Sequence, residues 1–221
     1  MRLAGLQDAD VAATLDKLQR KSGGDALVFL RALPAALGAV VTGKPVFAAV
    51  APLLMKRAFL SVGAKYGRLL YLLARAKRAR CIVEYGASYG ISSIYLAAAA
   101  KANGGRLITT ELDTEKAAAA ERHLAEAGLS DVAQVRWGDA RESLAPLAGP
   151  IDMLFLDGWP GATLEIVRML HPRLASGAIV LADNIAIFPK TLRPFVAWMA
   201  DPANGFETAP SRLGLALWVK T

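Results

Sequence analysis

The stretch CIVEYGASYGISSIYLAAAA, residues 81–100, indicates the fold, because an apolar run breaks at small residues and then resumes at once as an alanine-rich helix. A strand, a glycine turn and a helix in direct succession begin a βαβ unit. Gly86 and Gly90 allow the turn to approach a ligand closely and allow the helix to start tight against the strand. Glu84, at the exit of the strand, disfavours a pyrophosphate and suits a cationic or hydrogen-bond-donating ligand.

Short apolar runs alternate with helical patterns along the rest of the chain. Strands are predicted at residues 81–86, 106–112, 133–139, 151–158 and 177–184, and helices near 90–102, 114–128, 141–147, 162–174 and 189–200. This alternation indicates a parallel sheet with both faces buried and right-handed crossovers. The last two runs, 205–211 and 213–221, lie too close together for a crossover helix and predict an antiparallel hairpin. Residues 56–221 are therefore predicted to form a doubly wound, Rossmann-like α/β domain, with a mostly parallel seven-stranded sheet and an antiparallel C-terminal strand.

Residues 1–55 are predicted to form an N-terminal helical extension. A polar helix is predicted over 8–21 and apolar helical pieces over 26–55, with breaks at Pro34, 43–45 and Pro52, and a helix in 56–80 is expected to break near Gly63 and Gly67. Neither uninterrupted apolar half reaches the roughly 18 to 20 residues that a membrane span needs, so no stable membrane insertion is expected. Because its apolar side chains are costly to leave in water, we expect the extension to form a lid over the acceptor site or a homodimer contact.

The composition limits the compartment and the partners. The 221 residues are 54% hydrophobic, enough for a sizeable core, and the single cysteine, Cys81, leaves no intramolecular disulfide. The N-terminal residues lack the apolar core of a signal peptide, so a reducing, cytoplasmic setting is expected. A net charge of +7 suits an anionic partner, but the bases Arg75, Lys77, Arg78 and Arg80 precede the first strand, opposite the predicted ligand edge. We interpret them as a solvated helix end and expect no nucleic-acid partner.

Two further acids follow predicted strands. Glu111 closes the second strand, about 21 residues beyond Gly90, where a carboxylate characteristically accepts both hydroxyls of a ribose. Asp139 closes the third strand and is available to an adenine amino group. These features fit S-adenosylmethionine better than NAD: the turn suits a cation, one carboxylate is placed for the ribose and another for the adenine. NAD-binding proteins carry a Gly-x-Gly-x-x-Gly turn that this chain lacks.

The sequence resembles the class I S-adenosylmethionine-dependent O-methyltransferases of the catechol and caffeoyl-CoA type. The resemblance runs from FLSVGAKYGRLL at residue 59 to the end and rests on VEYGASYGISS, LITTELD, WGDA, FLDGW and LADN, in the order of that family. It implies cofactor contacts at the following positions, together with Gly90 of the turn and Asp157 of the fourth strand: Val62, Glu84, Gly86, Ala87, Tyr89, Ser92, Glu111, Asp139, Ala140 and Trp159. The first 50 or so residues lie outside it.

Three oxygen-bearing side chains follow the fourth and fifth strands: Asp157, Asp183 and Asn184. Two carboxylates and an amide carbonyl suit Mg²⁺ or another hard divalent cation, with positions left for water and substrate oxygens. The resembling family uses these positions for a metal that binds adjacent oxygens of a catechol-like acceptor. The plainer alternative is that Asp and Asn simply close turns after strands.

Two features depart from the family pattern. Pro160 stands where the family has a lysine that serves as general base, and the C-terminal PSRLGLALW lacks the acid that helps to hold a catechol. The acceptor is therefore expected to differ from a simple catechol, or the base to come from elsewhere. Lys190, just beyond the fifth strand, is the candidate substitute, although a solvated lysine at a helix start is the plainer interpretation.

These observations predict an S-adenosylmethionine-dependent O-methyltransferase that acts on the hydroxyl of a small molecule with the help of a divalent metal, with Asp157 and Lys190 as candidate catalytic residues. The alternatives are a metal-independent or non-catalytic S-adenosylmethionine-binding protein, a nucleic-acid methyltransferase and an NAD-dependent oxidoreductase. His123 and His171 lie in helical stretches away from the strand exits and are interpreted as structural.

Overall fold

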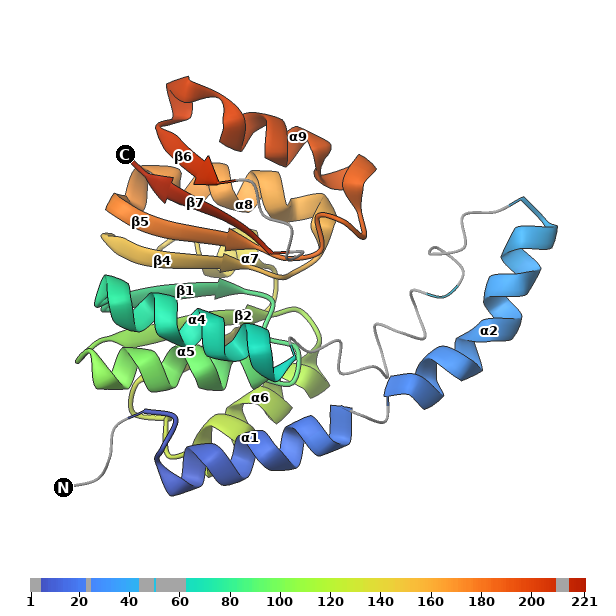
Figure 1. Cartoon of the computed structure of the whole chain (residues 1–221), viewed down its shortest axis with the longest axis horizontal. Helices are drawn as coiled ribbons and strands as arrows, with labels where there is room; N and C mark the ends of the chain where they lie inside the picture. The colour runs from blue at the N-terminus through green and yellow to red at the C-terminus, as the bar shows by residue number, and fades with distance from the viewer. Residues whose placement is uncertain (1–4, 23–24, 44–49, 51–62, 210–214) are drawn as a thin grey trace.

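The computed structural model describes residues 5–22, 25–43, 50, 63–209 and 215–221, and in them a seven-stranded sheet forms the centre (Figure 1). The strands are β1 Cys81–Tyr85, β2 Arg106–Glu111, β3 Ala133–Trp137, β4 Ile151–Leu156, β5 Leu174–Ala182, β6 Phe206–Ala209 and β7 Ala216–Lys220. Their order is β3-β2-β1-β4-β5-β7-β6. The first five pair in parallel, whereas β7 runs antiparallel to both β5 and β6. The predicted fold class is therefore confirmed.

Helices cover both faces of the sheet (Figure 1). Their bounds are α1 Ala9–Ser22, α2 Asp25–Val41, α4 Ala64–Lys77, α5 Ile91–Ala102, α6 Thr114–Glu126, α7 Ala140–Ser143, α8 Thr163–Leu170 and α9 Pro189–Ala200, with short 3₁₀ turns η1 Pro160–Ala162, η2 His171–Arg173 and η3 Pro202–Asn204. Alternate residues of β4 separate the two cores. Met153 and Phe155 pack with α1, α4, α5 and α6, while Leu154 and Leu156 pack with α7, α8 and α9. Burial on both faces explains why the strands are continuously apolar.

The alanine-rich segment forms α5, in which residues 91–100 are all buried. Small side chains let α4 approach closely: a Cβ added at Gly67 would lie 2.2 Å from the ring of Tyr95. The break expected at Gly67 is therefore wrong, because α4 continues through it and needs a glycine there for packing. The helix does begin directly after Gly63, which occupies its N-cap position.

Four other features differ from the predictions. Helix α2 runs through Pro34, so the predicted break there is wrong; the leucines and alanines around it are good helix formers that offset one missing hydrogen bond. The helix expected over 141–147 ends at Ser143, and the one expected over 162–174 is α8 flanked by η1 and η2. Strand β5 starts at Leu174 because that residue pairs with Ile151, ahead of an irregularity between Ile151 and Met153.

The two described N-terminal helices lie differently. Val11, Leu15 and Leu18 of α1 belong to the core cluster under α5 and α6, so α1 is part of the domain's packing. Helix α2 stands away from the sheet (Figure 1). The breaks predicted at residues 44–45 and at Pro52 lie outside the described residues, and the division at residue 55 stays a prediction. None of the described helices has both the length and the apolarity to cross a membrane.

Candidate functional site

The candidate site lies at the carboxyl ends of β1 and β4, the neighbouring strands at which the sheet order reverses. Backbone hydrogen bonds continue past the strands at this edge: Asp157 N donates to the Tyr85 carbonyl at 2.9 Å and Asp183 N donates to the Leu156 carbonyl at 3.0 Å. The residues that follow β1, β4 and β5 therefore leave the sheet at equivalent heights. Side chains that are distant in the sequence meet here for that reason.

The turn after β1 needs its glycines. Gly86 has a φ of 96°, and a Cβ there would lie 2.6 Å from the Cα of Gly158. The close approach is thus between two turns of the chain itself, those after β1 and β4. Gly90, with a φ of 84°, is the N-cap of α5 and completes the tight entry into that helix.

Glu111, the last residue of β2, is held by two backbone amides. Its Oε2 accepts from Ser88 N at 2.7 Å, and its Oε1 accepts from Asp113 N at 3.0 Å. These bonds link the turn after β1 to the turn after β2 through one carboxylate. Each oxygen keeps further lone pairs, so the carboxylate can accept from a ligand without releasing either turn.

Glu84 lies beneath the turn, with none of its surface exposed. Burial raises the pKa of this carboxyl, the nearby hydroxyls of Ser92, Ser93 and Thr109 oppose the rise, and the charge of Glu111 adds to it. Ser93, on α5, donates its hydroxyl to Glu84 Oε2. Contact of Glu84 with a cofactor therefore stays a prediction.

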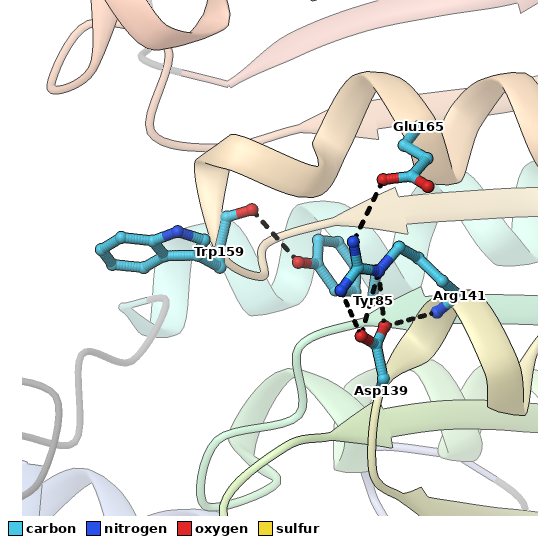
Figure 2. Close-up of polar contacts among 5 residues, drawn as sticks. All are labelled: Tyr85, Asp139, Arg141, Trp159 and Glu165. Carbon is cyan, nitrogen blue, oxygen red and sulfur yellow. Dashed lines mark hydrogen bonds and ion pairs between the residues drawn. The ribbon is translucent and has the colours of Figure 1, made fainter.

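Asp139 forms a compact polar group with Arg141, which Figure 2 shows beside Tyr85 and Trp159. Asp139 caps α7 by accepting from Arg141 N at 2.9 Å, while Arg141 Nε lies 3.0 Å from both carboxylate oxygens and Nη2 also donates to Oδ2. Hydrogen bonds from Arg141 lower the pKa of Asp139 to about 2. Arg141 Nη1 reaches Glu165 of α8 at 3.4 Å.

Tyr85 forms the floor between this group and the turn after β4 (Figure 2). Its hydroxyl donates to the Trp159 carbonyl at 3.1 Å, and its ring lies so close to the turn that a Cβ on Gly158 would meet it at 2.5 Å. Burial, then the charge of Asp139, raises the pKa of Tyr85 to about 12. The phenol therefore stays protonated and keeps the backbone of Trp159 in place.

The three predicted metal ligands are brought together. Asn184 Nδ2 donates to Asp157 Oδ1 at 2.7 Å, and Asn184 N donates to Asp183 Oδ1 at 2.7 Å. Burial, then the charges of Asp183 and Glu84, raises the pKa of Asp157 well above its ordinary value. Among the described residues neither aspartate forms an ion pair, and no cluster of three or more His, Cys, Asp or Glu side chains suits a metal.

This donor set fits a divalent cation. Two carboxylates that repel each other, with no cationic side chain of the described residues bound to them, are relieved by a cation between them. The amide nitrogen and oxygen of Asn184 exchange places on a half-turn of the side chain, which would offer the oxygen as third ligand. The remaining ligands would have to come from water or substrate.

The comparisons with known proteins agree with this geometry. A family model described as a methyltransferase domain matches residues 83–185. Catechol O-methyltransferase of Niastella koreensis is 37% identical over 130 residues, 57% of this chain and 58% of that protein. The enzyme of that name from Sus scrofa is 30% identical over 137 residues, 59% of this chain and 73% of that protein. The chain belongs to the catechol O-methyltransferase-like family of class I S-adenosylmethionine-dependent O-methyltransferases.

A solved structure matches a larger share of this chain than the curated relatives do. The O-methyltransferase TomG from Streptomyces achromogenes, in complex with S-adenosylmethionine, is 26% identical with a TM-score of 0.63, over 86% of this chain and 89% of that one. Among the first curated relatives that it matches, the chain spans 49% to 58% of their length. The family is thus established, and the activity of this chain is a separate question.

The described residues for which the resemblance implies a cofactor contact gather at one edge of the sheet, whereas Lys190, the candidate base, lies apart from them. Gly86, Ala87, Tyr89, Gly90 and Ser92 form the turn after β1 and the start of α5, Glu111 ends β2, Asp139 and Ala140 follow β3, and Asp157 and Trp159 follow β4. Val62 lies outside the described residues. Lys190 is exposed in the first turn of α9, where it lines an open hollow of about 420 Å³ with Pro189 and Arg193.

Three residues of this edge were missed from the sequence. Arg141 grips Asp139, and nothing in the sequence pattern signals a contact between residues two apart across a helix cap. His123 Nδ1 lies 2.8 Å from the Tyr89 carbonyl, so this histidine supports the turn. Leu112, next to Glu111, is 71% exposed. Its position directly after Glu111, the carboxylate predicted to bind the ribose, was the sequence feature that could have identified it.

Proposed function

We propose that this chain binds S-adenosylmethionine at the carboxyl edge of β1, β2 and β4 and transfers its methyl group to a hydroxyl oxygen of a small molecule. One observation carries the proposal: Glu111 is fixed at the end of β2 by amides of two turns and keeps lone pairs for a pair of vicinal hydroxyls. A ribose presents such a pair. Family membership supports the same cofactor.

The adenosine half of the cofactor matches the side chains around Glu111. Leu112 is 71% exposed and Trp159 is 48% exposed, so apolar faces are available for the flat adenine ring. Asp139 is an acceptor for its amino group. We assign the sulfonium end to the turn at Gly86, where the buried carboxyl of Glu84 favours positive charge when it is ionised.

The acceptor side is assigned to the ends of β4 and β5. Asp157, Asp183 and Asn184 would hold a divalent cation, which when bound lowers the pKa of an acceptor hydroxyl and fixes its position. The sulfonium of S-adenosylmethionine supplies the activated methyl group, and attack by oxygen joins unlike charges and ends neutral. The contribution of this chain is a fixed, water-poor edge between the two groups.

Pro160 removes the lysine base that the family places after the first metal aspartate. It is buried at the start of η1, so no side chain at this position can take up a proton. Lys190 is our candidate substitute, with release of the proton to water as the alternative. The pH profile of kcat in Lys190→Met decides between them: loss of the acidic limb, on which kcat rises with pH, identifies Lys190 as the base, and an unchanged profile assigns the proton to water.

The test of the function is direct binding followed by turnover. Calorimetry is expected to show binding of S-adenosylhomocysteine and no comparable binding of NAD. With labelled S-adenosylmethionine and a panel of phenolic and other hydroxylated acceptors, label is expected on oxygen. Chelator should abolish turnover and Mg²⁺ restore it, while Asp183→Ala should lose turnover but keep cofactor binding. Full turnover in excess chelator would refute the metal, and absence of cofactor binding would refute the function.

We further propose that α2 forms a contact with a second copy of the chain. Leu30, Leu33, Leu37 and Val40 are between 52% and 65% exposed and recur at intervals of three and four residues, which places them on one face of the helix. Light scattering should give a dimer, and Leu33→Gln with Leu37→Gln should give a monomer. Ala35→Gln, on the opposite face, is the matched control; a monomeric parent protein would exclude the contact.

A further inference from the structure

Arg141 binds the carboxylate of Asp139 with both its backbone N–H and its guanidinium. The Asp139 oxygens accept from Arg141 N, Nε and Nη2, so the carboxylate plane is fixed by donors from one neighbouring residue. A helix cap needs only the first of these bonds. The guanidinium contacts therefore exceed what a cap requires, and the helix that Asp139 caps, α7, has only four residues.

We propose that Arg141 is a positioning residue that orients Asp139 as the acceptor for the exocyclic amino group of adenine, and so makes the site selective for an adenine-bearing cofactor over one with an oxo group at that place. This inference rests on the proposed function and adds a residue to it. Arg141 itself need not touch the cofactor.

The geometry leaves one edge of the carboxylate for a ligand. The Asp139 side chain is 32% exposed although its oxygens accept four N–H contacts, and the Tyr85 ring and the Trp159 turn lie beside it (Figure 2). A carboxylate has about four lone-pair sites, and only three N–H groups meet it here, because Nε divides its one N–H between the two oxygens, so one site stays open to a ligand. Without the guanidinium, rotation about the Asp139 side chain would move the open edge away from the place where the adenine ring must lie.

The chemistry gives the selectivity. An ionised carboxylate only accepts hydrogen bonds, so it pairs with the amino group of adenine and repels the carbonyl oxygen of hypoxanthine. Hydrogen bonds from Arg141 lower the pKa of Asp139 to about 2, which keeps it an acceptor throughout the neutral range. Glu165 of α8 lies 3.4 Å from Nη1, on the side of the guanidinium away from Asp139.

The test compares S-adenosylhomocysteine with S-inosylhomocysteine, which differs in that one group. Calorimetry of the full chain should give a preference for the adenine compound of about tenfold or more, since a hydrogen bond to a charged group is at stake. In Arg141→Met the affinity for S-adenosylhomocysteine should fall about tenfold, while that for S-inosylhomocysteine changes little. The selectivity ratio should therefore collapse.

Two further variants separate positioning from mere folding. Arg136→Met removes an arginine of β3 that also contacts α7, because its Nη1 donates to the Ser143 carbonyl at 2.6 Å, and should leave the ratio intact. Asp139→Asn should shift the ratio toward S-inosylhomocysteine, because an amide can also donate. An unchanged ratio in Arg141→Met, with only a lower melting temperature, would overturn the inference. If the parent protein bound neither compound, the proposed function itself would fail, and this inference with it.

Discussion

Replacing Glu111 by alanine should weaken S-adenosylhomocysteine binding by at least about 3 kcal/mol, or a hundredfold or more in Kd. The figure follows from two ribose hydroxyls that donate to one carboxylate, at about 1.5 kcal/mol or more for each bond to a charged group. The variant also frees Ser88 N and Asp113 N, which Glu111 accepts at 2.7 Å and 3.0 Å, so the two turns lose their common anchor. The loss should therefore exceed that for the ribose alone.

Calorimetry with a ligand that lacks the 2′-hydroxyl separates these two effects. If ribose recognition is lost, Glu111→Ala should cost the 2′-deoxy ligand clearly less than the natural one, because part of the interaction is already absent. Glu115→Ala, which removes an exposed acid four residues along, is the control for charge. An equal loss for both ligands would show that Glu111 only holds the turns, and an unchanged Kd would refute its role altogether.

The remaining predictions concern stability as well as binding. Gly86→Ala should cost at least about 2 kcal/mol in urea unfolding and abolish cofactor binding, because its Cβ would lie 2.6 Å from the backbone of Gly158; normal unfolding would contradict the close approach. Asp152→Ala should cost about 1 to 3 kcal/mol by leaving Arg80 N and Cys81 N without an acceptor, yet leave cofactor affinity unchanged at the opposite edge. Glu84→Gln should gain stability over the parent as pH rises. Burial raises the pKa of Glu84 in the folded state above its ordinary value of 4.5. The free energy of unfolding of the parent is therefore highest below pH 4.5 and falls as the pH rises through the raised pKa, whereas glutamine does not titrate and adds no such fall. Parallel unfolding profiles of the two proteins between pH 4.5 and 8 would refute this.

The sheet was predictable because its strands are buried on both faces. A strand such as Ile151–Leu156 is then apolar at nearly every position, and such a run can be recognised in the sequence without knowing which strands lie beside it. The start of β5 could not be predicted, since Leu174 joins the strand by pairing with Ile151 of β4, and residues 175–178 lie in the irregularity that follows. The role of Gly67 depends on the ring of Tyr95 in another helix, a contact that periodicity along one segment cannot reveal.

The candidate site divides in the same way. Residues at strand ends were found because parallel topology alone brings them to one edge, as it does for Asp157 and Asp183. The depth of Glu84 was not foreseen, because it depends on how closely α5 packs over the turn and turns Ser93 toward the carboxyl. Arg141 was missed for a third reason: its contact is local, but the cap geometry that creates it exists only once α7 ends after one turn.

Pro160 changes what the rest of the acceptor side must supply. The Trp159 carbonyl accepts from the Tyr85 hydroxyl at 3.1 Å and from Ala162 N at 3.1 Å, and the proline ring fixes the backbone that follows it. The turn after β4 is thus stiffened at Trp159, for which we propose an adenine contact, while position 160 offers no titratable group to the proposed acceptor side. A site with a rigid cofactor wall and no lysine at this position depends more on the charge balance at Asp157 and Asp183, whose mutual repulsion already favours a bound cation. If the acceptor binds here as we propose, a weakly acidic hydroxyl would lose its proton less readily than with a lysine at position 160, and acceptors with an acidic hydroxyl are the ones that this arrangement suits best.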